Sequence, residues 1–157
     1  MTYVIPKFEG DYFFLSNFYE FPVEYNIYDR PVSLKTNEHA FQAAKYKAMD
    51  ADYPLAQADY FESVVKADTP GEAKGLGHKV KIDTGKWDSL KIDVMREVCW
   101  NKFKNDRMKS LLLATGPAML VEGNTWDDVF WGRCNGKGYN MLGVILMEIR
   151  GYWRINE

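Results

Sequence analysis

One short segment of the sequence gathers several side chains that are capable of acid–base or nucleophilic chemistry. Residues 36–45 read TNEHAFQAAK and include a carboxylate at Glu38 and an amine at Lys45. In a helix, with about 100° of rotation per residue, Glu38, Gln42 and Lys45 fall on one narrow stripe. The helix dipole favours an ionised Glu38 in the first turn. The stripe is either half of an active site or a solvated polar face, and the helix alone favours the solvated face.

The histidines and cysteines form no recognisable catalytic or metal-binding pattern. His39 is expected to make a structural hydrogen bond, because no Ser or Cys is spaced to form a nucleophilic arrangement with it. With two histidines, and with Cys99 and Cys134 far apart, no metal-ligand spacing is present. The sequence therefore predicts neither a metal nor a cofactor, no disulfide, and a buried Cys99.

A second candidate region is the unusual segment 122–138, which holds two tryptophans, three carboxylates and four glycines. A loop this long is usually functional or disordered, and its aromatic residues argue against disorder. Neighbouring side chains in an extended segment point to opposite sides, so only one of Asp127 and Asp128 is expected to face a cleft. Alternatively, an aspartate caps a turn, and Trp126 and Trp131 are core anchors.

The composition is that of a globular protein with one domain. The chain has 157 residues, of which 46% are hydrophobic and 27% charged, and its net charge is −2. A nucleic-acid-binding protein is usually basic, although lysines cluster in residues 66–109. No apolar run approaches the roughly 20 residues of a membrane span, and no signal peptide is recognisable. We expect a cytoplasmic protein.

Helical periodicity dominates the chain after a short strand-rich beginning. Residues 1–35 predict two to four short strands, and 118–122 predict another. Thr36 and the pair Thr69–Pro70 are typical of helix starts. Gly75 and Gly77 either weaken the third helix or bring a neighbouring backbone close. Trp87 is placed just ahead of the longest helix, as a stacking platform or a hydrophobic staple. The predicted helices are 36–49, 54–66, 70–79, 88–104, 106–114 and 139–150.

Five blocks of the sequence resemble the YbiA/NADAR family. They are FLSNFY (14–19), TNEHAFQAAK (36–45), WDSLKIDVM (87–95), LLLATGPAMLVEGNTWDDVFWG (111–132) and GYNMLGVILMEIR (138–150). They occur in the order found in the family and cover nearly the whole chain. The resemblance implies a mainly helical α+β fold: a single compact domain over residues 1–157, with a few short strands at the N-terminus.

The resemblance also implies an N-glycosidase that cleaves the C1′–N bond of amino-linked ribosides without a cofactor. One branch of the family acts on early riboflavin-pathway intermediates, and another removes ADP-ribose from guanine in nucleic acid. The implied catalytic residues are Glu38, Lys45 and Asp127. The implied substrate-binding residues are Phe14, Ser16, Asn17, Trp87, Trp126, Asp128, Trp131, Gly132 and Arg133.

These side chains suit the chemistry that the resemblance implies. Departure of the base nitrogen builds positive charge at C1′, which an ionised Glu38 would stabilise. Lys45 either neutralises phosphate or forms a Schiff base with an opened ribose. The backbone amides of Thr36 and Asn37, and the glycine-rich stretch 132–138, are further expected phosphate sites.

Three functional alternatives remain at the level of sequence. We favour removal of ADP-ribose from guanine in DNA or in a nucleotide, since the chain resembles stand-alone members of the family. The second alternative is a small riboside phosphate from riboflavin biosynthesis. The third is a non-catalytic module that binds ADP-ribose or nucleotides. No membrane association and no obligate protein partner are expected.

Overall fold

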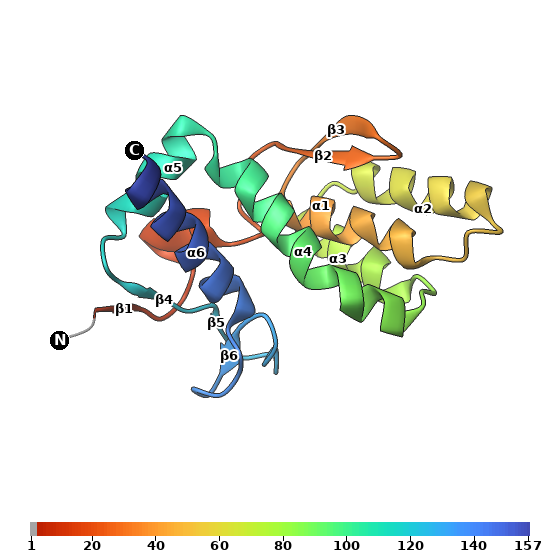
Figure 1. Cartoon of the computed structure of the whole chain (residues 1–157). Coiled ribbons are helices and arrows are strands. Elements are labelled where there is room, and N and C mark those ends of the chain that lie inside the picture. The colour runs from red at the N-terminus through yellow and green to blue at the C-terminus, as the bar shows by residue number, and fades with distance from the viewer. Residues whose placement is uncertain (1–2) are drawn as a thin grey trace. The chain divides into compact units, whose positions relative to one another are not determined.

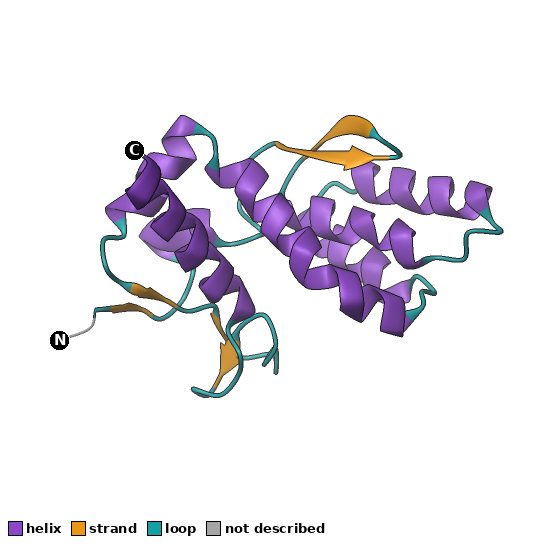
Figure 2. Cartoon of the chain, viewed as in Figure 1, coloured by secondary structure: helices purple, strands orange, loops and turns teal. Residues whose placement is uncertain are grey.

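The computed structural model describes residues 3–157, whose helices and short strands form two units (Figures 1 and 2). The first unit combines the chain up to Tyr19 with Phe103–Glu157, and the second unit is Glu20–Lys102. Helices predominate in both units, and three of the short strands lie in the N-terminal 34 residues. The prediction of a mainly helical α+β fold is confirmed.

The second unit opens with a β-hairpin that packs on one face. Strands β2 (Val23–Ile27) and β3 (Arg30–Leu34) pair antiparallel, with Val23 opposite Leu34. Tyr28 and Asp29 both have positive φ, as a tight two-residue turn requires. Alternate residues of β2 are buried, which gives the hairpin one apolar face.

The remainder of the second unit is helical, and two of its helix starts follow the predicted caps. The side chain of Thr36 accepts a hydrogen bond from the His39 amide, and that of Thr69 accepts one from the Glu72 amide. The bounds of the second and third helices agree with the prediction. The helical elements are α1 (Asn37–Ala43), the 3-10 helix η2 (Ala44–Ala48), α2 (Pro54–Lys66), α3 (Pro70–Lys79) and α4 (Thr84–Phe103).

Two predicted helix boundaries in the second unit were wrong. The first helix does not run as one α-helix to about Met49, because it tightens to 3-10 geometry after Ala43. The longest helix begins at Thr84 rather than near Asp88, since Asp83 accepts a hydrogen bond from the Lys86 amide as a cap. Trp87 therefore lies in the first turn of α4 and not ahead of it.

Helix α1 is the buried centre of the second unit. All seven of its residues are buried, and it contacts α2, α3 and β2. On α3, the small residues Ala73 and Gly77 are one turn apart and both buried, so the two helix backbones can approach closely.

The first unit is built around the C-terminal helix, which packs against α5 and β4. Its buried residues Leu142, Ile145, Leu146 and Ile149 follow helical periodicity, as predicted, although the helix is longer than predicted. Two pairs of short parallel strands, β1–β4 and β5–β6, complete this unit. The elements are β1 (Val4–Ile5), the 3-10 helix η1 (Gly10–Leu15), α5 (Asp106–Ala114), β4 (Met119–Leu120), β5 (Gly123–Asn124), β6 (Arg133–Cys134) and α6 (Met141–Asn156).

The two cysteines lie in different units, Cys99 in the second and Cys134 in the first, and both are buried free thiols. The burial of Cys99 confirms the prediction for that residue. Among residues 3–157, no helix is both long enough and apolar enough to span a bilayer.

Candidate functional site

The polar stripe of the first helix faces the interior of the second unit. Glu38 is 7% exposed, Gln42 3% and Lys45 8%. Buried ionisable and amide side chains are uncommon, and they require hydrogen-bond partners or a functional reason. The alternative of a solvated polar face is therefore wrong, because α1 is enclosed by its neighbours on every side.

Glu38 is held by the side chain one turn further along α1. The amide Nε2 of Gln42 donates a 2.7 Å hydrogen bond to Glu38 Oε1. Tyr60, from α2, fixes the same turn by donating its hydroxyl to the backbone oxygen of Gln42 at 2.7 Å. Burial, together with the charge of Glu38, raises the pKa of Tyr60, so its hydroxyl remains a donor at neutral pH.

Lys45, on η2, contacts the C-terminal part of α3. Its Nζ donates a 2.9 Å hydrogen bond to the carbonyl oxygen of Gly77 and lies 5.8 Å from the centre of the Trp87 ring. Burial lowers the pKa of Lys45, and the charge of Glu38 partly opposes that effect. Partial burial and the charge of Lys45 also lower the pKa of the neighbouring His78. A buried amine of lowered pKa beside a carboxylate has the properties of a nucleophilic lysine.

Trp87 is buried in the same cluster. Its ring packs against Phe41 of α1 with the centroids 5.2 Å apart and the planes at 55°. The ring thus connects the first turn of α4 to α1 and borders the Lys45 ammonium.

His39 has the structural role that was predicted. The ring is fully buried, and its Nε2 lies 2.9 Å from the carbonyl oxygen of Ala67, which can only accept a hydrogen bond. The other nitrogen, Nδ1, is therefore the acceptor for the Thr36 hydroxyl at 2.8 Å. Burial lowers the pKa of His39. The residue ties the start of α1 to the end of α2.

In the first unit, Asn124 organises the loop that carries the two aspartates. Its Nδ2 donates to the carbonyl oxygen of Asp128 at 2.7 Å, and its Oδ1 accepts from the Trp126 and Asp128 amides. Asp128 Oδ1 in turn accepts from the amides of Phe130 and Trp131, at 3.2 and 2.9 Å. The turn-capping alternative therefore applies to Asp128.

Asp127 differs from its neighbour in both geometry and contacts. Its φ is +62°, and its exposed carboxylate lies 3.7 Å from Cys134 Sγ, which is a weak donor. Because its oxygens do not cap the turn, Asp127 has a carboxylate available for another partner.

The two loop tryptophans have different environments. Trp126 is 58% exposed, so the alternative of a core anchor is wrong for this residue. Trp131 is half-buried and packs edge-on against Phe130 at 4.8 Å. Arg133 donates its Nε to the carbonyl oxygen of Gly138, and Gly132 is buried against the Glu122 backbone.

The remaining predicted residues surround the end of η1 in the first unit. Phe14 and Asn17 are buried, and Ser16 Oγ accepts from the Phe18 amide at 3.1 Å. The predicted site residues thus form two clusters. Glu38, Lys45 and Trp87 lie together in the second unit, whereas η1 and the 124–138 loop belong to the first.

The predicted phosphate site at Thr36 and Asn37 was wrong. Both residues are almost completely buried, and the Thr36 hydroxyl caps the helix. No cluster of three or more His, Cys, Asp or Glu side chains in residues 3–157 has an arrangement that would hold a metal ion.

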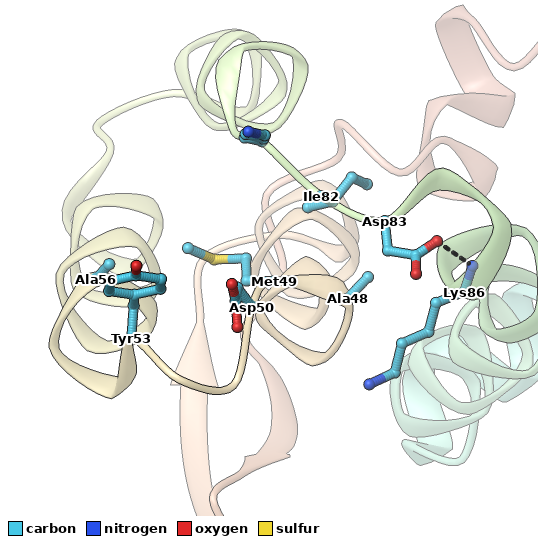
Figure 3. Close-up of a pocket in the computed structure, with 9 residues that line it drawn as sticks. Ala48, Met49, Asp50, Tyr53, Ala56, Ile82, Asp83 and Lys86 are labelled. Carbon is cyan, nitrogen blue, oxygen red and sulfur yellow. Dashed lines mark hydrogen bonds between the residues drawn. The ribbon is translucent and has the colours of Figure 1, made fainter.

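A pocket of about 660 Å³ opens in the second unit at the end of η2 (Figure 3). Figure 3 shows Tyr53 and Lys86 on its two sides, with Met49 and Asp50 between them. Lys81 and Lys86 are exposed at its wall. Its lining residues are Ala48, Met49, Asp50, Tyr53, Ala56, Lys81, Ile82, Asp83 and Lys86.

Sequence reasoning missed the residues that hold the predicted ones in place. Tyr60 and Asn124 each contact a site residue or its turn, yet neither was selected from the sequence. The sequence did predict close packing at Gly75 or Gly77 as one alternative, and this is confirmed at Gly77, where an added methyl group would overlap Gln42.

Known proteins are similar to this chain over most of its length. Residues 6–154 match the model of the NADAR domain. The chain is 37% identical to the N-glycosidase YbiA of Shigella boydii over 143 residues, which are 89% of this chain and 81% of that protein. It is 36% identical to the chloroplastic riboflavin biosynthesis protein PYRR of Zea mays over 125 residues, which are 73% of this chain and 19% of that protein.

The fold is likewise similar to a solved structure. The NMR structure of Escherichia coli YbiA matches with a TM-score of 0.75 and 32% identity, over 99% of this chain and 88% of that one. The family model spans both units, and the relatives named YbiA are N-glycosidases. The chain therefore belongs to the NADAR domain family.

Proposed function

We propose that this protein is an N-glycosidase that cleaves the C1′–N bond of an amino-linked riboside. One observation carries the proposal: Glu38 on α1 and Lys45 on the following η2 are both buried, and burial lowers the pKa of the lysine. The N-glycosidases among the relatives support the same class of reaction.

In the proposed mechanism, Lys45 acts as the nucleophile. As the amino nitrogen of the base donates its lone pair to C1′, the bond from C1′ to the ring oxygen breaks and that oxygen takes up a proton from water, which leaves an iminium between C1′ and the amino nitrogen. The neutral Lys45 amine adds to C1′, and the C1′–N bond to the base breaks as that nitrogen takes up a proton. Water then hydrolyses the lysine imine, which releases the sugar aldehyde and restores the amine. Glu38 stabilises the positive charge at C1′ and exchanges protons with the reacting nitrogen.

The alternative mechanism is direct attack by water on an oxocarbenium-like C1′. Glu38 then orients the water, and Lys45 only supplies charge. The burial of Lys45 favours the nucleophilic role, because it lowers the pKa of the amine. Exposed lysines of the second unit are better suited to phosphate than this one.

We further propose that the pocket of the second unit holds the phosphate portion of the substrate. Its volume of about 660 Å³ is typical of small-ligand sites. Lys81 and Lys86 are exposed at its wall and have no ion-pair partner within residues 3–157. Replacing both lysines by Met should raise the KM for a phosphorylated riboside while changing kcat little.

For the loop, we propose that Asp127 and not Asp128 acts on the substrate. The Asp128 carboxylate is occupied by two backbone amides, whereas Asp127 is exposed. Asp127 would hold the ribose hydroxyls or assist proton transfer. Trp126, also exposed, would stack on a heterocycle, a contact worth about 1–3 kcal/mol per base.

The substrate that we favour is guanine carrying ADP-ribose on its amino group, in DNA or as a nucleotide. The exposed ring of Trp126 and the basic residues Arg133 and Lys137 on the same loop suit a nucleic-acid substrate. The second candidate is a riboside phosphate of early riboflavin biosynthesis. It is favoured by the similarity to the plant riboflavin biosynthesis proteins.

One experiment distinguishes these substrates. The protein is incubated with an oligonucleotide containing ADP-ribosylated guanine and, separately, with the ribosylamino-pyrimidine phosphates, and the products are identified by mass spectrometry. We expect the oligonucleotide to lose its ADP-ribose and to carry unmodified guanine. Release of the pyrimidine alone would assign the riboflavin intermediates. Binding of ADP-ribose without release of any base would indicate a non-catalytic module and contradict the proposal.

A further inference from the structure

Gly77 of α3 contacts two side chains of the polar stripe, Gln42 of α1 and Lys45 of η2. Its carbonyl oxygen accepts the 2.9 Å hydrogen bond from Lys45 Nζ. In a longer helix this carbonyl would accept from the amide of residue 81, but α3 ends at Lys79, which leaves the oxygen available. The negative end of the α3 dipole therefore lies against the Lys45 ammonium.

The Cα of Gly77 packs directly against the Gln42 amide. A methyl group added at residue 77 would overlap Gln42 Oε1 and would lie 3.3 Å from its Cγ. Rotating the Gln42 amide by half a turn would place Oε1 beside the Glu38 carboxylate. That carboxylate accepts hydrogen bonds and therefore requires the donor Nε2 on its side. Gln42 Oε1 is buried and has no hydrogen-bond donor among the described residues. This agrees with its packing against the Cα of Gly77, which offers no donor.

We infer that Gly77 is a positioning residue for both Glu38 and Lys45. The absence of a side chain lets α3 approach α1, so that the Gln42 amide can orient Glu38 while the Gly77 carbonyl anchors Lys45. The inference rests on the proposed function, since it concerns the geometry of the two residues to which that function assigns the chemistry.

Gly75 offers a matched control. It lies two residues earlier in the same helix, and a methyl group added there would meet nothing within 4 Å. Ala is favoured over Gly in a helix interior, so the two substitutions share the same backbone effect. They differ in whether the new methyl group displaces Gln42.

The test compares Gly77→Ala with Gly75→Ala by two independent measurements. Titration of Lys45 by NMR in protein with isotope-labelled lysine reports its environment without requiring activity. We expect Gly77→Ala to move the pKa of Lys45 towards that of an ordinary lysine, because the displaced amine gains solvent and burial is the main cause of its lowered pKa. We also expect kcat to fall by about 100-fold with a smaller change in KM, as for displaced catalytic groups. Gly75→Ala should leave both quantities unchanged.

A second variant keeps the inference testable if Gly77→Ala unfolds. Gln42→Ala removes the overlapping atoms, so Gly77→Ala should cost little stability in that background, as measured by urea unfolding. An equal loss of stability in both backgrounds would overturn the steric argument. Folded Gly77→Ala protein with the wild-type Lys45 pKa and kcat would overturn the positioning role.

The outcomes also separate this inference from the proposed function. If the wild-type protein releases no base, the proposed function fails, but the NMR titration still decides whether Gly77 positions Lys45. If base release is normal in Gly77→Ala, the N-glycosidase assignment stands and only the role of Gly77 is lost.

Discussion

At the scale of single residues, the site depends on ionisable groups that are kept out of water. Glu38 and Lys45 are among the few buried charged side chains of the second unit, and each is held by a short hydrogen bond to a neighbouring group. Such burial costs free energy that packing alone does not require. Substitutions at Glu38 and at Lys45 test whether these buried groups are catalytic.

Glu38→Gln should reduce kcat by at least about 100-fold, because the neutral amide cannot stabilise positive charge at C1′. The change preserves the size of the side chain, so circular dichroism should be unaltered. Glu62→Gln, on the exposed face of α2, is the matched control and should retain full activity. Full activity of Glu38→Gln in a base-release assay would remove this residue from the mechanism.

The rate should rise with pH through a pKa below that of an ordinary lysine, about 10.4. The nucleophilic form is the neutral amine, which predominates above the pKa, and burial lowers the pKa of Lys45. A profile of kcat against pH measures this rise. Lys45→Arg should be inactive at every pH, since a guanidinium stays protonated, whereas Lys47→Arg should behave like the wild type. A flat profile would contradict the role.

At the scale of elements, local signals were predictable from the sequence and long-range ones were not. The caps at Thr36 and Thr69 depend on residues three positions away, and both were identified correctly. Within the buried stripe, Lys45 donates to the carbonyl oxygen of Gly77, which is 32 residues away in sequence. Nothing within α1 itself distinguishes a stripe that faces another helix from one that faces water.

In the loop of the first unit, too, the local feature was predictable from the sequence and the contact that depends on the fold was not. The sequence suggested that only one of two adjacent aspartates would be available, because neighbouring side chains diverge. Identifying which one required the positions of the Phe130 and Trp131 amides, since these amides occupy Asp128.

Asp128→Ala should lower the free energy of unfolding by about 1 kcal/mol or more, because two backbone amides lose their acceptor. Asp127→Asn should leave stability nearly unchanged and reduce kcat, since its carboxylate is exposed and makes one weak contact. Urea unfolding and base release measured on both variants test the assignment. The reverse pattern would transfer the catalytic role to Asp128.

Because the pKa of His39 is lowered in the folded protein, the protein should become less stable in mild acid. Burial lowers this pKa, so the unfolded chain binds a proton more readily than the folded one. The stabilisation is complete above the unfolded pKa of about 6.5 and is lost as pH falls below that value. The free energy of unfolding should therefore drop between pH 7.5 and 5.5, and His39→Gln should flatten that slope. An unchanged slope would exclude His39 as the cause.

At the scale of the whole molecule, one family model covers residues 6–154 and thus both units. Glu38, Lys45 and Trp87 belong to the second unit, and Asp127 and Trp126 belong to the first. We propose that residues 1–157 form one functional domain. Base release measured on Asp127→Asn and on Glu38→Gln tests whether activity depends on both units.

The most direct test of the central claim is covalent trapping at Lys45. The protein is incubated with the aminoriboside substrate in the presence of borohydride, digested, and mapped by mass spectrometry. The proposed mechanism predicts one reduced sugar adduct, located on Lys45, together with released base. Release of base under the same conditions with Lys45 unmodified would contradict the nucleophilic role and assign the reaction to water.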